Sequence, residues 1–372
     1  MKELQIKDIC SKGSSSLKQK DLQEQGKYPV YGASGIAGYL DLYHQENEYI
    51  AIVKDGSGIG RVTFNEPKTS VIGTMQYILP KKGYNIRYIG YCLQSLDLAN
   101  YRQGAAIPHI YFRDYGERVV RVTNDSAEQE RIVERLDAAF AQIDELKSNA
   151  ERQLAEARAL FQSALTQAMQ PKPGWQEKKL VNVCDIFGRI GFRGYTTKDL
   201  VSSQNDGAIS LSPSNIQNGE MDYSKRTYIS WFKYNESPEI KIFNGDILLV
   251  KTGSSYGKSA LVKDLPHEAT INPQSVVLKN FRINNEFFAY QLRTERVKKE
   301  FDQFVSGTAI PTFSQAKLGT VPIYLPSEIE QEQIVSYLNS LNNHVRELEE
   351  ISRKTAAECD ALKQALLRQI FE

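Results

Sequence analysis

One pattern is written twice in this chain, about two hundred residues apart. Ala106-Ile107-Pro108, followed by Glu128-Gln129-Glu130, returns as Ala309-Ile310-Pro311, followed by Glu330-Gln331-Glu332. A glycine loop is doubled as well, because Val53 to Arg61 corresponds to Val250 to Lys258. A repeat this long indicates a duplicated module, since the repeats of solenoid proteins run to roughly 20 to 50 residues. The sequence therefore predicts two similar halves related by a pseudo-two-fold axis.

The length of 372 residues predicts two globular domains plus their connections. The four expected segments are 1–122, a first globular domain; 123–172, a first helical spacer; 173–326, a second globular domain; and 327–372, a second helical spacer. Formal charge follows the same division, with +4 for 1–122, −4 for 123–170, +5 for 171–326 and −4 for 327–372. Alternating blocks of this kind are typical either of basic modules that meet an anion, joined by acidic elements that do not, or of ordinary surface variation.

Two long helices are predicted, over 126–170 and 327–371. Neither range contains proline or glycine, and the first is rich in Ala, Glu, Gln, Leu and Arg. Asp125 or Ser126 can cap the first helix, and Pro171 ends it. At about 1.5 Å per residue, each helix would be roughly 65 Å long.

A helix of that length needs a partner, and both sequences carry an apolar stripe. Steps of alternately four and three residues give a coiled-coil seam in each helix. The seam residues are Ile132, Leu136, Ile143, Leu146, Leu160, Leu338, Leu341, Val345, Leu348, Leu362 and Leu366. The simplest packing is antiparallel, helix against helix within the chain. The alternatives are that each helix folds back on its own domain or that helices pair between chains.

Each globular domain is expected to be rich in short strands, with a glycine-tipped hairpin. Glu48 to Lys54 and Arg61 to Phe64 read as two strands around a turn, and Asp246 to Lys251 and Lys258 to Lys263 read as their counterparts. Glycines at the tips let the backbone approach a phosphate closely, and the neighbouring Ser, Tyr and Lys side chains supply donors.

The second glycine loop nearly matches a nucleotide-binding P-loop. That motif needs four residues between its glycines and a helix after it, whereas Gly253 and Gly257 are separated by three residues and a strand-like Ala260-Leu261-Val262 follows.

No Gly-x-Ser-x-Gly or His-Glu-x-x-His is present, so we expect no catalytic residues. Four dispersed cysteines and four histidines predict neither a disulfide framework nor a metal site. Without an apolar run of 18 residues or a signal-peptide core, the chain is expected to be soluble and cytoplasmic.

Two strand-rich domains, each ending in Ala-Ile-Pro, a strand and a Glu-Gln-Glu-x-Ile-Val helix, resemble the specificity subunit of type I restriction-modification systems. The resemblance covers essentially the whole chain and implies an α+β fold: two target-recognition domains joined by two long antiparallel coiled-coil helices. Tyr28 to Gly35 and Ile209 to Ile216 are similar to two common types of recognition domain.

The resemblance implies that each domain reads one half of a split site in double-stranded DNA and that the helices set the gap. Candidate phosphate contacts are Lys54, Arg61, Arg102, Lys251 and Lys258, and candidate base contacts include Tyr31, Ser34, Gln103, Tyr256 and Asn215. Ser57, Ser254 and Ser255 complete the candidate DNA-binding set.

The resemblance also implies partners. Two methyltransferase subunits would dock on the helices and domains, and restriction/translocase subunits would join for cleavage; no membrane is involved. No cofactor is expected on this chain, because S-adenosylmethionine, ATP and magnesium belong to the partner subunits. Two rivals remain open: a P-loop-like ATP-binding protein, and a coiled-coil adaptor without sequence-specific DNA binding.

Overall fold

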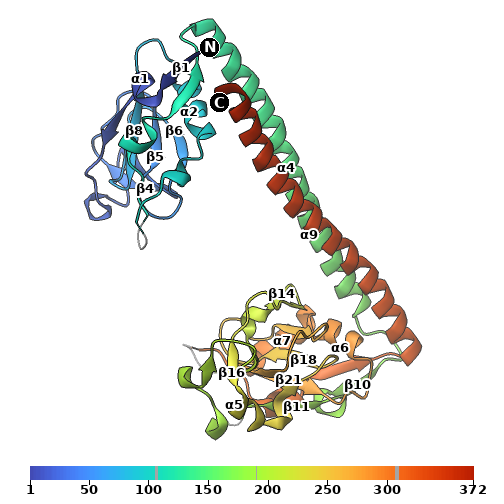
Figure 1. Ribbon diagram of the computed structural model, residues 1–372. Helices are drawn as coiled ribbons and strands as arrows, with labels where there is room; N and C mark the ends of the chain where they lie inside the picture. The colour runs from blue at the N-terminus through green and yellow to red at the C-terminus, as the bar shows by residue number, and fades with distance from the viewer. Residues whose placement is uncertain (105–107, 190, 306–309) are drawn as a thin grey trace. The chain divides into compact units, whose positions relative to one another are not determined.

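The computed structural model describes residues 1–104, 108–189, 191–305 and 310–372. By contacts between residues the chain divides into two compact units, Met1–Gln153 with Glu349–Glu372, and Leu154–Leu348. Each unit therefore consists of one strand-rich domain together with a part of both long helices, α4 (Ser126–Ala168) and α9 (Glu328–Phe371), which Figure 1 shows. The expected α+β fold is confirmed.

The first unit is built on two small sheets. An antiparallel sheet has the order β2 (Cys10–Ser14), β8 (Met75–Pro80), β5 (Tyr49–Val53) and β6 (Val62–Asn65). A second sheet has the order β4 (Gly35–Leu40), β3 (Tyr28–Gly32) and β7 (Ser70–Val71), with β3 and β7 parallel. A two-stranded ladder joins β1 (Lys2–Gln5) to β9 (Val119–Val122), and α1 (Ile6–Ile9), α2 (Ile86–Ser95) and α3 (Phe112–Tyr115) complete the unit.

The second unit repeats this plan. Its antiparallel sheet has the order β11 (Asp185–Gly188), β21 (Ser275–Lys279), β18 (Ile247–Val250) and β19 (Ser259–Leu261). A ladder joins β10 (Gln176–Lys179) to β22 (Pro322–Leu325), as β1 joins β9. The internal duplication predicted from the sequence is thus present in this sheet and this ladder.

The remaining sheets of the second unit carry its additions. A five-stranded sheet has the order β12 (Leu200–Val201), β16 (Tyr228–Ser230), β13 (Gly207–Leu211), β20 (Ala269–Ile271) and β17 (Lys241–Ile242). Its parallel pair, β13 and β20, corresponds to β3 and β7. A hairpin of β14 (Ile216–Gln217) and β15 (Glu220–Met221) and the helices α5 (Trp231–Asn235), α6 (Asn285–Leu292), α7 (Glu295–Phe304) and α8 (Gln315–Gly319) complete the unit.

Both glycine hairpins form as expected. Strands β5 and β6 pair antiparallel around the first loop, and β18 and β19 pair antiparallel around the second. The loops need glycine for steric reasons: at Gly60, φ is +84° and a Cβ atom would lie 2.6 Å from the backbone nitrogen of Ala99. Because the second loop runs into strand β19 and not into a helix, it lacks the geometry of a nucleotide-binding P-loop.

The two long helices lie against each other within the chain. In the first unit, Asp144 pairs with Lys363 over 2.6 Å and Lys147 pairs with Asp360 over 3.2 Å, which fixes an antiparallel order. Side chains of both helices also share each unit's apolar core: Leu136 with Leu367 in the first, and Phe161 with Leu338 in the second. Within each unit, α4 and α9 therefore pack together and against the domain.

The predicted seam needs correction at three positions. Leu146, Leu160 and Leu362 are 59%, 64% and 49% exposed. The other seam residues are buried or half-buried: Ile132, Leu136, Ile143, Leu338, Leu341, Val345, Leu348 and Leu366. Beyond Ile143, the inward positions of α4 shift by one residue to Lys147, Leu154 and Phe161. These three positions are again seven residues apart, so the stripe of α4 keeps its seven-residue spacing and changes its phase by one residue.

Candidate nucleic-acid interface

The glycine loop of each unit is held by the same set of backbone hydrogen bonds. In the first unit, Gly56 N–H donates to Pro108 O over 3.0 Å, Ile110 N–H to Lys54 O over 2.9 Å, and Gly60 N–H to Val53 O over 2.8 Å. The N–H groups of Lys54 and Asp55 both donate to Thr74 O. The loop, the turn before β8 and the segment after Pro108 therefore form one surface.

The second unit reproduces these bonds at the corresponding positions. Gly253 N–H donates to Pro311 O over 2.9 Å, Phe313 N–H to Lys251 O over 3.2 Å, and Gly257 N–H to Val250 O over 2.8 Å. The proline of the repeated Ala-Ile-Pro thus has a structural role, because its carbonyl accepts a hydrogen bond from the glycine loop. Ala106, Ile107 and Ala309 lie outside the described residues.

The predicted site residues of the first unit gather on this surface in part. Lys54 lies on the loop and forms an ion pair with Asp55. Arg61 closes the loop, and its Nη1 donates to Ala33 O over 2.7 Å, which ties the loop to the exposed β3–β4 turn that carries Ser34. The exposed residues include Ser57, Arg102 and Gln103; Gln103 Nε2 donates to Asp114 Oδ2 over 2.9 Å.

Tyr31 has a different position in the first unit. It is half-buried in β3 and packs against the cluster of Tyr49, Val53 and Tyr77. Its ring therefore contributes to the support of the loop surface.

In the second unit the loop presents its polar side chains more openly. Ser254 and Lys258 are exposed, and Lys251 and Ser255 are half-exposed. Among the residues that the structure describes, the ammonium groups of Lys251 and Lys258 have no hydrogen-bond or ion-pair partner, so both remain available to an anion. Tyr256 O–H donates to Asp302 Oδ1 over 2.8 Å, and this hydrogen bond raises the pKa of the tyrosine, which keeps it a donor.

Asn215 was expected to reach a base edge, and this expectation is wrong. The residue is buried, and its Nδ2 donates to Asp222 O and Lys225 O, both over 2.9 Å. Its Oδ1 accepts from Ser212 N–H over 3.0 Å. With its amide groups used inside the domain, Asn215 fixes the loop at Ser212 and does not face a ligand.

The middle glutamine of each Glu-Gln-Glu motif is a structural residue that sequence reasoning missed. Gln129 is buried, accepts from Asn85 N–H through Oε1 over 2.6 Å, and donates through Nε2 to Gly83 O and Thr123 O. Gln331 accepts from Asn284 N–H and donates to Pro326 O. The same glutamine stands between two glutamates in both halves, and this repetition was the signal in the sequence. A buried amide group needs several fixed hydrogen-bond partners.

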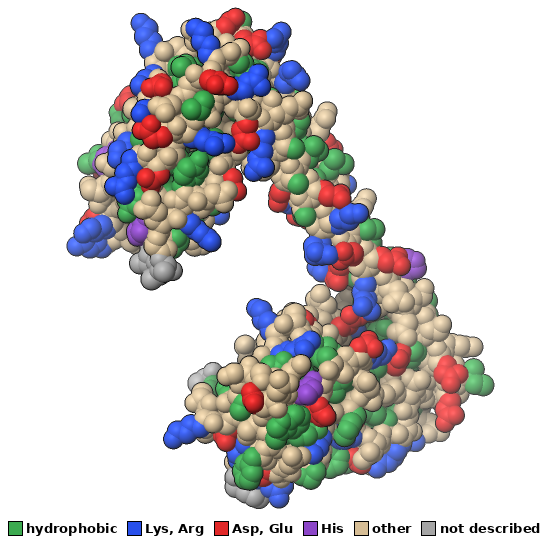
Figure 2. All heavy atoms as spheres, in the orientation of Figure 1, with side chains coloured by type: hydrophobic (Ala, Val, Ile, Leu, Met, Phe, Trp, Pro, Cys, Tyr) green, Lys and Arg blue, Asp and Glu red, His purple; other side chains and the backbone are tan. Residues whose placement is uncertain are grey.

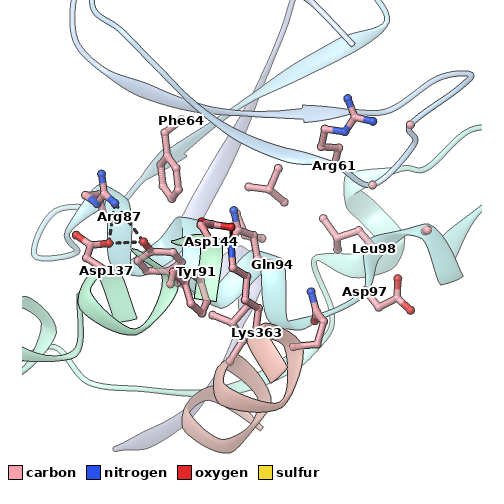
Figure 3. A pocket seen from close by; sticks show the side chains of 18 of the residues that line it. Arg61, Phe64, Arg87, Tyr91, Gln94, Asp97, Leu98, Asp137, Asp144 and Lys363 are labelled. Carbon is pink, nitrogen blue, oxygen red and sulfur yellow. Dashed lines mark hydrogen bonds and ion pairs between the residues drawn. The ribbon is translucent and has the colours of Figure 1, made fainter. Parts of the chain in front are cut away.

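A groove of about 940 Å³ lies in the first unit, between the β5–β6 loop, α2 and the helix pair. Figure 3 shows Arg87, Asp137 and Tyr91 linked at its edge, where Arg87 Nη2 donates to Asp137 Oδ1 over 2.7 Å. In the second unit the corresponding helices are linked by Tyr290, whose hydroxyl donates to Asn339 Oδ1 over 2.6 Å. Both links fix a domain helix, α2 or α6, against a spacer helix.

The second unit partly fills the space that corresponds to this groove. Its β14–β15 hairpin places Glu220 against α9, where Asn342 Nδ2 donates to Glu220 Oε1 over 2.5 Å. The cavity left beside it is about 370 Å³. The two halves therefore share a frame and differ in what their inserted segments cover.

Charge on the visible face is mixed. Figure 2 shows Lys and Arg side chains interspersed with Asp and Glu over both domains, so the basic charge of 1–122 and 171–326 does not form one continuous patch on that face. Among the described residues, no group of three or more His, Cys, Asp or Glu is placed to hold a metal ion. Likewise, no helix in the described part of the chain is both long and apolar enough to span a membrane.

Comparisons with known proteins agree with this duplicated architecture. The family model "Type I restriction modification DNA specificity domain" matches residues 1–156 and again 173–358. The type I restriction enzyme MjaVIII specificity subunit of Methanocaldococcus jannaschii is 22% identical over 395 residues, covering 97% of this chain and 89% of that protein.

Solved structures show the same fold. One is a chain from a study of complex assembly and conformational transition of the type I R-M system, with a TM-score of 0.70 at 16% identity, covering 99% of this chain and 97% of that one. The HsdS subunit from Thermoanaerobacter tengcongensis has a TM-score of 0.51 at 16% identity, covering 100% and 96%. Since the family model matches both halves, the chain belongs to the type I restriction modification DNA specificity family.

Proposed function

We propose that this chain is the DNA sequence-recognition subunit of a type I restriction-modification complex, in which each domain reads one half of a bipartite site. The observation that carries the proposal is the pair of glycine loops. Matching backbone bonds hold both loops, while side chains at equivalent positions differ: Asp55, Gly58 and Ile59 in the first loop correspond to Thr252, Ser255 and Tyr256 in the second. Two loops with the same backbone structure and different side chains suit two domains that bind DNA in the same orientation and recognise different bases.

In this proposal the helix pair sets the separation of the two half-sites. Ion pairs join α4 to α9 in the first unit, and shared apolar cores join them in both units. Gln129 and Gln331 attach these helices to the N-terminal ends of α2 and α6. When rigid elements hold two readers, half-site spacing becomes a geometric property of the protein.

The chain itself has a non-catalytic role, as its family implies. Two adenine methyltransferase subunits would dock on the helices and domains, one for each half, and bind S-adenosylmethionine. Restriction/translocase subunits would bring ATP and magnesium, and the complex would act in the cytoplasm. The duplication supports two equivalent docking places, because each unit offers the same junction of domain and helices.

A domain exchange tests the proposal. Residues 1–122 are replaced by the recognition domain of another specificity subunit, the chimera is assembled with methyltransferase subunits, and methylated adenines are mapped. We expect one half of the methylated sequence to change while the other half and the spacing remain. Replacing 173–326 should change the opposite half. An unchanged methylated sequence in both chimeras would reject the proposal and favour an adaptor role.

A further inference from the structure

The two halves contain one backbone bridge at the same place with different side chains. Asp55 pairs with His109 in the first unit, and Thr252 pairs with Thr312 in the second, each as an isolated antiparallel bridge. Each bridge joins the residue before the loop's first glycine to the residue after the repeated proline. The surrounding backbone bonds are also matched, as described above. The positions are therefore equivalent although the residues are not.

In the first unit the bridge carries a charged and aromatic group. Nδ1 of His109 lies 2.6 Å from Asp55 Oδ1, and the other carboxylate oxygen receives Lys54. A carboxylate only accepts, so the Nδ1–H donates, and Nε2 of a neutral imidazole is left with its lone pair. His109 is 39% exposed, and among the described residues no hydrogen-bond partner occupies Nε2.

The bridge of the second unit carries two small hydroxyl groups. Thr252 Oγ1 and Thr312 Oγ1 are 2.8 Å apart. Thr252 also lines a pocket of about 210 Å³ together with Ser212, Ser254 and Ser255. This surface presents methyl and hydroxyl groups where the first unit presents an imidazole.

A purely structural bridge would have no need for this difference, because either pair closes the same backbone geometry. Aromatic neighbours orient the imidazole in the first unit: Tyr111 stacks on His109 with ring centroids 6.4 Å apart, and the Arg113 guanidinium lies 4.7 Å from the Tyr111 centroid. The imidazole is thus held from Nδ1 and from one ring face, which directs its Nε2 edge away from those partners.

We propose that this bridge is a specificity-determining position in each domain, an inference that rests on the proposed function. In the first domain, His109 Nε2 accepts a hydrogen bond from the exocyclic amino group of adenine or cytosine, the two bases that offer such a donor in the major groove. Asp55 is the positioning residue that sets the tautomer. In the second domain the threonine pair reads a different base pair through its methyl and hydroxyl groups.

The test exchanges the two pairs in the complete complex. Variant Asp55→Thr with His109→Thr, and the reciprocal Thr252→Asp with Thr312→His, are assembled with methyltransferase subunits and S-adenosylmethionine. Each complex then methylates a DNA library randomised in both half-sites, and the methylated molecules are sequenced. We expect the first variant to lose about tenfold of its discrimination at one base pair of the first half-site, with the second half-site and the spacing unchanged. The reciprocal variant should change one base pair of the second half-site only.

The inference is overturned if both folded, assembled variants keep the wild-type preference at every position. It is also overturned if the first variant changes a base preference in the second half-site instead of the first. Should the double variant fail to fold, Asp55→Asn, which keeps the bridge but weakens the tautomer restraint, must still reduce discrimination at that base pair. A wild-type complex that methylates without sequence preference would instead reject the proposed function itself.

Discussion

The backbone N–H of Asn85 donates to Oε1 of Gln129 over 2.6 Å, and Asn284 makes the same bond to Gln331 over 3.2 Å. Each asparagine is the N-cap of a domain helix, and each glutamine lies in the first turn of a long spacer helix. The glutamine of the repeated Glu-Gln-Glu motif therefore makes a buried hydrogen bond that joins each domain to its spacer helix. Its flanking glutamates, Glu128 and Glu130, are left on the outer side of the turn.

Replacing Gln129 by leucine should destabilise the first unit. The substitution keeps the side chain's size but leaves Asn85 N–H and two carbonyl groups without their partner, which costs about 1 to 3 kcal/mol in the free energy of unfolding. Urea unfolding followed by circular dichroism measures the loss. Gln333→Ala, at an exposed position of α9, is the control and should stay within about 0.5 kcal/mol of the wild type. Equal stability of the two variants would mean that the Gln129 hydrogen bonds contribute nothing.

Neighbouring residues of α4 distinguish the observed helix contact from the heptad seam. Phe161 is 6% exposed in the core of the second unit, whereas Leu160 is 64% exposed. Phe161→Ala should cost about 3 to 5 kcal/mol, because it removes a buried aromatic ring and leaves a cavity. Leu160→Ala should change the unfolding free energy by less than about 0.5 kcal/mol. Urea unfolding measures both losses. If Leu160→Ala lost more unfolding free energy than Phe161→Ala, the predicted seam with Leu160 inside would be correct.

The sequence was sufficient for the features that repeat with a regular period. The long helices and both glycine hairpins follow from apolar spacing and turn residues, the repeated motifs predicted two similar halves, and all are present. Register over long distances was less predictable: a 3.5-residue stripe placed Leu146, Leu160 and Leu362 inside, but all three are exposed, and on α4 the stripe changes phase by one residue beyond Ile143. Side-chain roles in loops depend on contacts between distant segments. Asn215 was a candidate base contact, yet its side chain donates to the backbone of Asp222 and Lys225. His109, which pairs with Asp55, lies 54 residues further along the chain.

Low pH should reduce the free energy of unfolding of the second unit, in part because Asp185 becomes protonated. Hydrogen bonds from Asn280 Nδ2 over 2.8 Å and Arg282 Nη2 over 2.9 Å lower the pKa of this carboxyl below 3.8. A carboxyl whose pKa is lower in the folded state stabilises the fold above its unfolded pKa, and that contribution disappears as the pH falls through the folded value. We expect Asp185→Asn to unfold at lower urea than the wild type at pH 7, with the difference shrinking below pH 3.8. Urea unfolding of both proteins at a series of pH values from 7 downward measures this difference.

Lys251 and Lys258 should set the salt dependence of DNA binding. Both ammonium groups flank the second glycine loop, and neither has an anionic partner among the described residues. Each phosphate contact releases condensed counterions, so the slope of log K against log salt should become shallower by about 0.9 for each lysine replaced by alanine. Titrating the assembled complex with labelled duplex at several salt concentrations measures the slope. Lys354→Ala, on α9 and paired with Glu358, is the matched control and should leave the slope unchanged.

Because phosphate contacts carry no sequence information, both lysine variants should weaken binding to cognate and non-cognate duplexes alike. A loss confined to the cognate duplex would instead assign these lysines to base edges.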